Sequence, residues 1–82
     1  MATDAVALTR DLVRFDTINP PGAEADCIRQ VARLLETAGF ELATYDFAPG
    51  RTSLVARIGR RADAPPLCFT GHIDTVPLGA QP

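Results

Sequence analysis

Lysine and tryptophan are absent from the sequence, and histidine occurs only once in its 82 residues. All eight basic residues are arginines, and the formal net charge is −2. Arg60 and Arg61 form the only adjacent basic pair, whereas binding to a phosphate backbone requires a basic patch or stripe. The charge distribution therefore argues against a nucleic-acid partner.

Long hydrophobic runs are missing as well. No apolar stretch approaches the ~20 residues that a membrane-spanning helix needs, so we expect no contact with a membrane. The N-terminus also lacks a basic region followed by an apolar one, which a secretory signal would show. These absences predict a cytoplasmic protein.

Cysteine is scarce, and Cys27 and Cys68 lie far apart without a C-x-x-C pair. In a cytoplasmic protein we expect two reduced, buried thiols, with a disulfide or a metal thiolate as the alternatives. Serine occurs once, as Ser53, without the flanking glycines of a nucleophile elbow. This argues against a serine hydrolase. The glycines are isolated, so they form no phosphate-binding loop.

What is present is the composition of a globular protein, with 46% hydrophobic and 22% charged residues. The chain is long enough for one small domain at most, with a marginal core. Apolar residues recur at helical spacing over 4–15, where Thr3 or Asp4 can cap the first turn. The segment "DTINPPG" ends this helix, because its prolines withhold amide donors and restrict the residue before them.

A second helix is predicted over 23–38 by the same spacing of apolar residues. Glu24 and Asp26 fall in its first turn, where the helix dipole favours negative charge. Gly39 follows the last periodic residue and suits a left-handed C-cap.

Beyond Gly39 the period changes towards 2, which is typical of strands. We predict strands over 40–47 and 53–59 with a turn between them, and a third strand over 67–71. The third is a nearly continuous apolar run, as expected for a strand buried on both faces. The order of elements predicts an α/β fold in which helices pack on a mixed β-sheet.

His72 and Asp74 follow the third predicted strand directly. An imidazole at a strand end lies at the rim of a sheet, where open α/β sheets commonly bind ligands. If the chain stays extended, Asp74 lies on the same side as His72 and can accept a hydrogen bond from the ring. That bond would select one tautomer and raise the basicity of the other nitrogen. The alternative is a surface pair in which Asp74 only caps a turn.

The motif "GHIDTVP" after an apolar strand resembles the first metal-site motif of a family of zinc-dependent hydrolases. The family includes aminoacylase, acetylornithine deacetylase, succinyl-diaminopimelate desuccinylase and carboxypeptidase G. The upstream segments "LVRFDTINPPG", "LLETAGF" and "SLVARIG" also resemble the N-terminal part of this family in order and spacing. The resemblance runs from about residue 5 to the end of the chain.

The resemblance implies that residues 1–82 are the incomplete N-terminal portion of a zinc-peptidase-like catalytic domain. It implies His72 as a ligand of one zinc in a two-zinc site, with cobalt as a substitute, and Asp74 as a supporting catalytic residue. The family's other ligands and its general base have no counterpart here, since the sequence holds no second histidine and no Glu-Glu pair.

The leading hypothesis is therefore a fragment of a metallohydrolase that cleaves the amide bond of an N-acyl amino acid or a small peptide. The fragment alone should be inactive, and a homodimer is expected only for the intact protein. Two alternatives remain: a short non-catalytic α/β protein that binds a partner, and a fragment that assembles with a second chain carrying the missing ligands.

Overall fold

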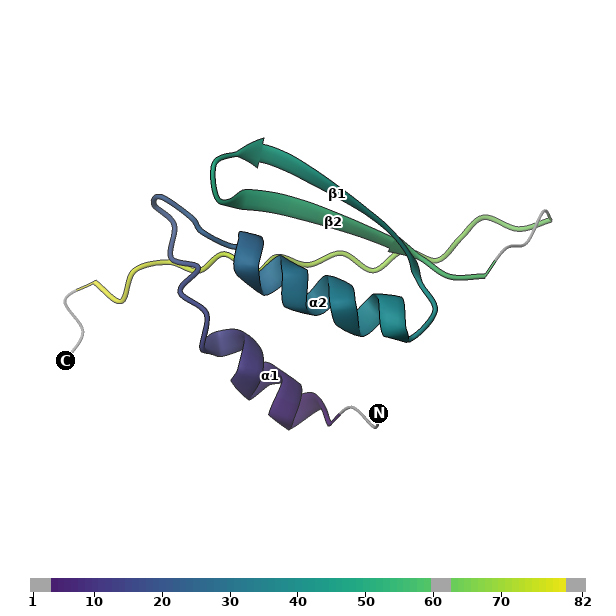
Figure 1. Ribbon diagram of the computed structural model, residues 1–82, viewed down its shortest axis with the longest axis horizontal. Helices are drawn as coiled ribbons and strands as arrows, with labels where there is room; N and C mark the ends of the chain where they lie inside the picture. Colours follow the sequence, from purple (N-terminus) through teal and green to yellow (C-terminus); the bar gives the residue numbers. More distant parts are fainter. Residues whose placement is uncertain (1–3, 60–62, 80–82) are drawn as a thin grey trace.

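The computed structural model describes residues 4–59 and 63–79. Its elements are helix α1 (Ala5–Val13), helix α2 (Ala25–Thr37), strand β1 (Glu41–Ala48) and strand β2 (Arg51–Arg57). Both helices and the first two strands are confirmed, with their ends displaced by a few residues from the predicted ones. Figure 1 shows α2 between the β1–β2 hairpin and α1; the hairpin and α2 form two packed layers, and α1 lies apart from them. The predicted α/β class is confirmed.

Helix α1 begins at the predicted cap, because Asp4 Oδ1 accepts a hydrogen bond from the Val6 amide at 2.9 Å. None of its residues is buried, and the apolar side chains of Val6 and Val13 are exposed. A helix of nine residues is marginal in water without packing on an apolar face. Helix α1 is therefore the least supported element of the described structure.

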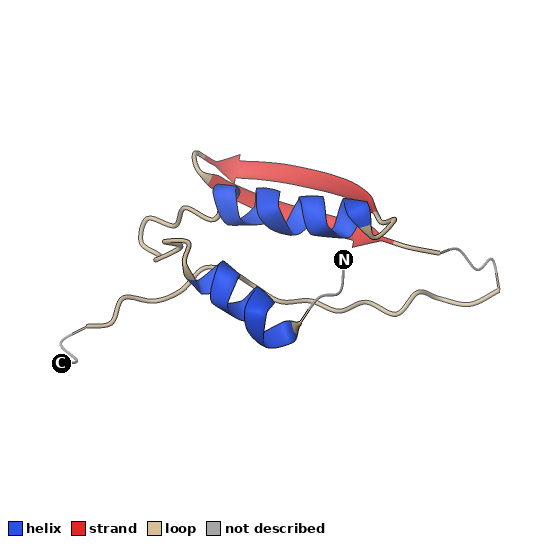
Figure 2. Ribbon diagram, turned by 60° about the horizontal axis from the view of Figure 1, so that its bottom comes forward, coloured by secondary structure: helices blue, strands red, loops and turns tan. Residues whose placement is uncertain are grey.

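Helix α2 and the hairpin form the packed part of the molecule. The strands are antiparallel, with Leu42 opposite Ala56 and Thr44 opposite Leu54. Half-buried positions alternate with exposed ones along β2, and α2 packs on the hairpin (Figure 2). Among the described residues the buried hydrophobic side chains are Cys27 and Ile28, both on α2. The core is thus very small, as the chain length predicts.

The turn that follows α2 contains the predicted glycine cap. Gly39 has a φ of +98°, a conformation that glycine adopts without steric cost. It lies between the end of α2 and the start of β1, so it allows the chain to reverse onto the face of the helix.

The third predicted strand, 67–71, is wrong. This segment is extended but pairs with no other strand among the described residues, and Leu67 and Phe69 are 82% and 88% exposed. A strand needs hydrogen-bonding neighbours for its amides and carbonyls, and the two-stranded sheet does not extend to it. In the part of the chain that the structure describes, the sheet is the antiparallel hairpin rather than the predicted mixed sheet, and one isolated parallel bridge joins Ile18 to Thr75.

The cysteines are free, as predicted, but only one of them is buried. Cys27 lies in the core, whereas Cys68 is exposed because the extended segment that contains it is not covered. In the two described ranges, neither helix is long and apolar enough to cross a bilayer.

Candidate functional site

Residues 73–75 are held in place by the turn between α1 and α2. The Asn19 amide donates to the Thr75 carbonyl at 2.7 Å, and the Thr75 amide donates to the Thr17 carbonyl at 3.0 Å. The buried hydroxyl of Thr17 donates to the Ile73 carbonyl at 2.9 Å. Figure 1 shows the C-terminal segment passing beside this turn. The turn therefore fixes the backbone on which the candidate site residues lie.

His72 and Asp74 are in contact, as the period-2 argument predicts. His72 Nδ1 lies 3.0 Å from Asp74 Oδ1 and 3.0 Å from the Asp74 carbonyl oxygen. Both oxygens are acceptors, so the contacts require the proton to be on Nδ1. In the neutral ring the lone pair of Nε2 is then left for a ligand, and the His72 side chain is 83% exposed.

The second oxygen of Asp74 faces two other donors. Oδ2 accepts a hydrogen bond from Asn19 Nδ2 at 3.1 Å and lies 3.4 Å from Arg51 Nη2. The hydrogen bond from Asn19 lowers the pKa of Asp74 most, followed by the hydrogen bond from His72. Partial desolvation opposes this, and the charge of Arg51, together with that of His72 when its ring is protonated, adds to it. The carboxylate is therefore ionised at neutral pH.

Arg51 is itself held by a buried carboxylate. Its Nε lies 3.0 Å from Glu24 Oε1 and 3.3 Å from Oε2, and the Glu24 side chain is only 7% exposed. The guanidinium lies over the Phe47 ring, 5.0 Å from the centroid. It also approaches Gly22 so closely that a Cβ there would lie 2.6 Å from Nε. Glu24 thus makes no capping hydrogen bond at the start of α2, and its role is the ion pair.

The hairpin turn is tied to the same region through the backbone. The Ala25 amide, at the start of α2, donates to the Gly50 carbonyl at 3.0 Å. Arg51 is the next residue after Gly50, so this bond sets the point from which its side chain reaches Glu24 and Asp74.

The sequence predicts the His72–Asp74 contact but not the residues around it. Asp74 contacts Asn19 and Arg51, and Arg51 contacts Glu24. The partners in these contacts are 23 to 55 residues apart in the sequence. Local spacing carries no signal for such contacts. The available hint is the polar turn "DTINPPG", whose sequence predicts a turn first and a ligand-binding loop only with further evidence.

The described residues do not make up a complete metal site. Within residues 4–59 and 63–79, no group of three or more histidine, cysteine, aspartate or glutamate side chains could hold a metal ion. A catalytic zinc typically has about three protein ligands. The donor chemistry therefore fits one ligand, His72 Nε2, together with its orienting carboxylate.

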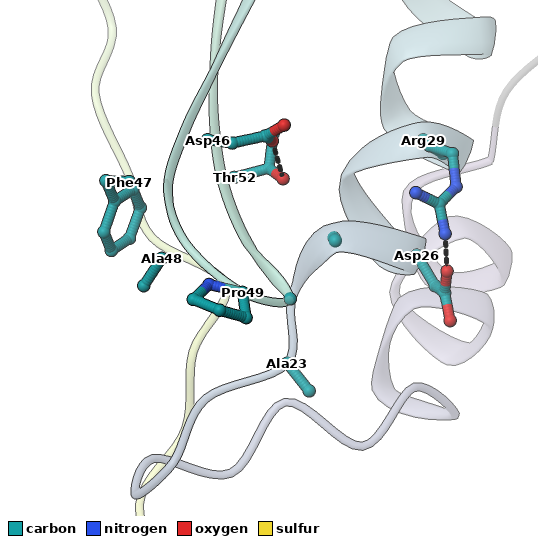
Figure 3. Close-up of a pocket in the computed structure, with 10 residues that line it drawn as sticks. Ala23, Asp26, Arg29, Asp46, Phe47, Ala48, Pro49 and Thr52 are labelled. Atoms are coloured by element: carbon teal, nitrogen blue, oxygen red, sulfur yellow. Dashed lines mark hydrogen bonds and ion pairs between the residues drawn. The ribbon is translucent and has the colours of Figure 1, made fainter.

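A shallow hollow lies elsewhere, between the start of α2 and the hairpin turn (Figure 3). Its polar side chains are already paired, since Arg29 contacts Asp26 and Thr52 donates to Asp46 at 2.7 Å. Neither His72 nor Asp74 lines it. The hollow is therefore not the candidate site, although Phe47, which contacts the Arg51 guanidinium, lines it.

Comparison with known proteins finds curated relatives over nearly the whole chain. The sequence is 43% identical over 85 residues to a succinyl-diaminopimelate desuccinylase of Nitrobacter hamburgensis, covering 99% of this chain and 21% of the relative. It is 43% identical over 84 residues to one of Rhodopseudomonas palustris, covering 98% and 20%. It is 41% identical over 80 residues to one of Gluconobacter oxydans, covering 94% and 20%.

The chain thus spans about a fifth of the length of the relatives it matches. No family model matches the sequence, and no solved structure matches it. The resemblance predicted from "GHIDTVP" and its upstream segments is confirmed by these relatives.

Proposed function

Because the chain is related over nearly its full length to the hydrolase family that includes succinyl-diaminopimelate desuccinylase, we propose that it is part of an amide-cleaving metallohydrolase. The observation that supports this most directly is the His72–Asp74 contact at 3.0 Å, which leaves Nε2 free. The pair lies within a sequence 43% identical to a desuccinylase.

In this proposal His72 Nε2 is a ligand of one zinc in a two-zinc centre, with cobalt as a substitute. Asp74 holds the imidazole in the required tautomer and increases its basicity, as carboxylates behind metal-bound histidines do. Bound zinc would polarise the substrate carbonyl and lower the pKa of a water molecule. The remaining ligands and the general base would come from another part of a longer protein.

The substrate class is an N-acyl amino acid or a small peptide, and the relatives' name points to a succinylated amino acid. We place the intact enzyme in the cytoplasm, where it can form a homodimer, with no nucleic-acid or membrane partner. The chain by itself should not hydrolyse such a substrate, because one ligand and its carboxylate cannot organise a metal-bound water.

Calorimetric titration of the chain with zinc tests the ligand assignment. Weak binding is expected for the wild type, and no binding for His72→Ala. Asp74→Asn should weaken binding by about tenfold, because it removes the carboxylate behind the ligand. Cys68→Ser is the matched control, since Cys68 is the exposed alternative donor, and it should bind like the wild type.

The outcomes of this titration separate the two candidate zinc ligands, His72 and Cys68. Equal zinc affinity in the wild type and His72→Ala would remove His72 from the site and with it the proposed function. Loss of binding in Cys68→Ser alone would assign the metal to the thiolate, which was the alternative interpretation of the cysteines.

A further inference from the structure

We propose that Arg51 is a positioning residue of the candidate site: anchored on Glu24, its guanidinium holds one oxygen of Asp74 so that the other faces the His72 ring. The proposal rests on the proposed function, in which Asp74 orients His72. It adds a residue of strand β2 to a site that the sequence motif places entirely within 71–77.

The anchor is rigid because Glu24 is buried. A buried carboxylate is costly unless it is paired, and Arg51 Nε reaches both of its oxygens, at 3.0 and 3.3 Å. The Phe47 ring lies on one side of the guanidinium, and Gly22 leaves room for it on another. The Arg51 side chain is only 21% exposed, so these contacts define a single position for it.

The two oxygens of Asp74 then have separate partners. Oδ2 faces Arg51 Nη2 and Asn19 Nδ2, whereas Oδ1 faces His72 Nδ1. A carboxylate held at one oxygen cannot rotate freely about its Cβ–Cγ bond. The contacts at Oδ2 therefore direct Oδ1 at the imidazole.

The distances rank the two donors at Oδ2. Asn19 makes the shorter contact, 3.1 Å, while Arg51 at 3.4 Å lies beyond the usual length of a hydrogen bond. Arg51 acts mainly through its charge and Asn19 through its hydrogen bond. Removing Arg51 should therefore weaken the orientation of Asp74 without abolishing it.

A role in binding substrate fits Arg51 less well. Its Nε faces Glu24 and its Nη2 faces Asp74, so two of its three nitrogens already face carboxylates. A substrate carboxylate would have to displace one of these contacts. Positioning is the role that the observed contacts support.

The test is the tautomer of His72, read from long-range ¹H–¹⁵N spectra of the labelled full chain. The spectra are recorded at mildly basic pH, and the two ring ¹⁵N shifts themselves show when the imidazole is neutral. The wild type should show mainly the Nδ1–H form. In Arg51→Met the ratio of Nδ1–H to Nε2–H should fall by roughly twofold to fivefold, the range for one ion pair that is not fully buried. Arg33→Met, at an exposed arginine of α2, should leave the ratio unchanged.

Two further measurements cover the case in which Arg51→Met does not fold. Glu24→Gln removes the anchoring charge but keeps the shape, and it should lower the ratio in the same direction. In the wild type, rotation about the Cζ–Nη bonds of Arg51 and exchange of its Nη protons with water should both be slow compared with those of Arg33. A freely rotating Arg51 guanidinium overturns the proposal whether or not the variants fold.

The proposal and the proposed function fail in different ways. If the wild type lacks the Nδ1–H form, Asp74 does not orient His72 and the proposed function loses its premise. If the wild type has it and a folded Arg51→Met keeps the same ratio, only the role of Arg51 is wrong.

Discussion

Asn19 donates its side-chain amide to Asp74 Oδ2 at 3.1 Å although 55 residues separate them along the chain. The two lie together because the Asn19 backbone amide also donates to the Thr75 carbonyl at 2.7 Å. The turn "DTINPPG" is thus more than a connection between helices, since it binds the segment that carries His72 and Asp74.

Asn19→Ala should raise the pKa of Asp74 towards its ordinary value, because the hydrogen bond from Asn19 is the largest cause of its lowering. The measurement is a titration of the Asp74 carboxyl carbon by NMR. Gln30→Ala, at an exposed position of α2, is the control and should not change it. An unchanged pKa in Asn19→Ala would contradict the observed contact.

Stability should fall at acid pH in a manner that depends on Asp74. The pKa of Asp74 is lowered in the folded state, so its contribution is present above its unfolded value and is lost as the pH falls through the folded value. Urea unfolding of the wild type and Asp74→Asn across this range measures the effect. The difference in stability should shrink as the pH is lowered. A difference that stays constant would show that ionisation of Asp74 is not involved.

Gly22→Ala should lower the free energy of unfolding by about 2 kcal/mol, because alanine is strained in a left-handed backbone conformation and its Cβ would overpack the site. Gly22 has a φ of +81°, and a Cβ there would lie 2.7 Å from Arg51 Cζ. Gly59→Ala is the matched control, because its φ is +75° with nothing within 4 Å of the added atom. Urea midpoints that shift equally in both variants would show that Arg51 does not pack against Gly22.

Cys68 should react with an alkylating reagent much faster than Cys27. Cys68 is exposed and Cys27 is fully buried, and burial raises the pKa of the Cys27 thiol. At mildly basic pH Cys27 therefore holds less of the reactive thiolate. Mass spectrometry of the wild type and Cys68→Ser follows each site. Rapid labelling of Cys27 in the native chain would indicate that α2 does not stay packed on the hairpin.

Amide exchange should protect α2, the hairpin and the Thr75 amide, and leave α1 and 63–72 largely unprotected. Among residues 4–59 and 63–79, the buried apolar side chains all belong to α2, and large ones are exposed on the extended segment, including Leu67, Phe69 and Val76. Sedimentation should show self-association, which a Leu67→Ser and Phe69→Ser double variant should reduce. A monomer with protected amides across 67–71 would instead favour the short, partner-binding α/β protein.

The fold was predictable where the signal is local. The helix periodicity, the Asp4 cap and the left-handed Gly39 all follow from near neighbours in sequence and are confirmed. The absence of the third strand was not predictable, because the apolar run 67–71 shows only that the segment is suited to a buried strand. Whether it pairs depends on neighbours that the hairpin does not supply.

The candidate site divides in the same way. Extended geometry across two residues is enough to predict that Asp74 meets His72. The pairing of Glu24 with Arg51 was missed because an acidic residue near a helix start has a sufficient local explanation in the helix dipole. Its burial, which requires a partner, becomes visible only in three dimensions.

The bond from the Ala25 amide to the Gly50 carbonyl has a consequence for how this chain can vary. An extra residue in the Pro49–Gly50 turn would move the side chain at the start of β2 by ~3.3 Å and turn it to the opposite face of the hairpin. The guanidinium would then miss both of its carboxylates. Insertions and deletions among natural variants should therefore avoid this end of the hairpin and gather instead after β2, where no such contact restricts Gly59.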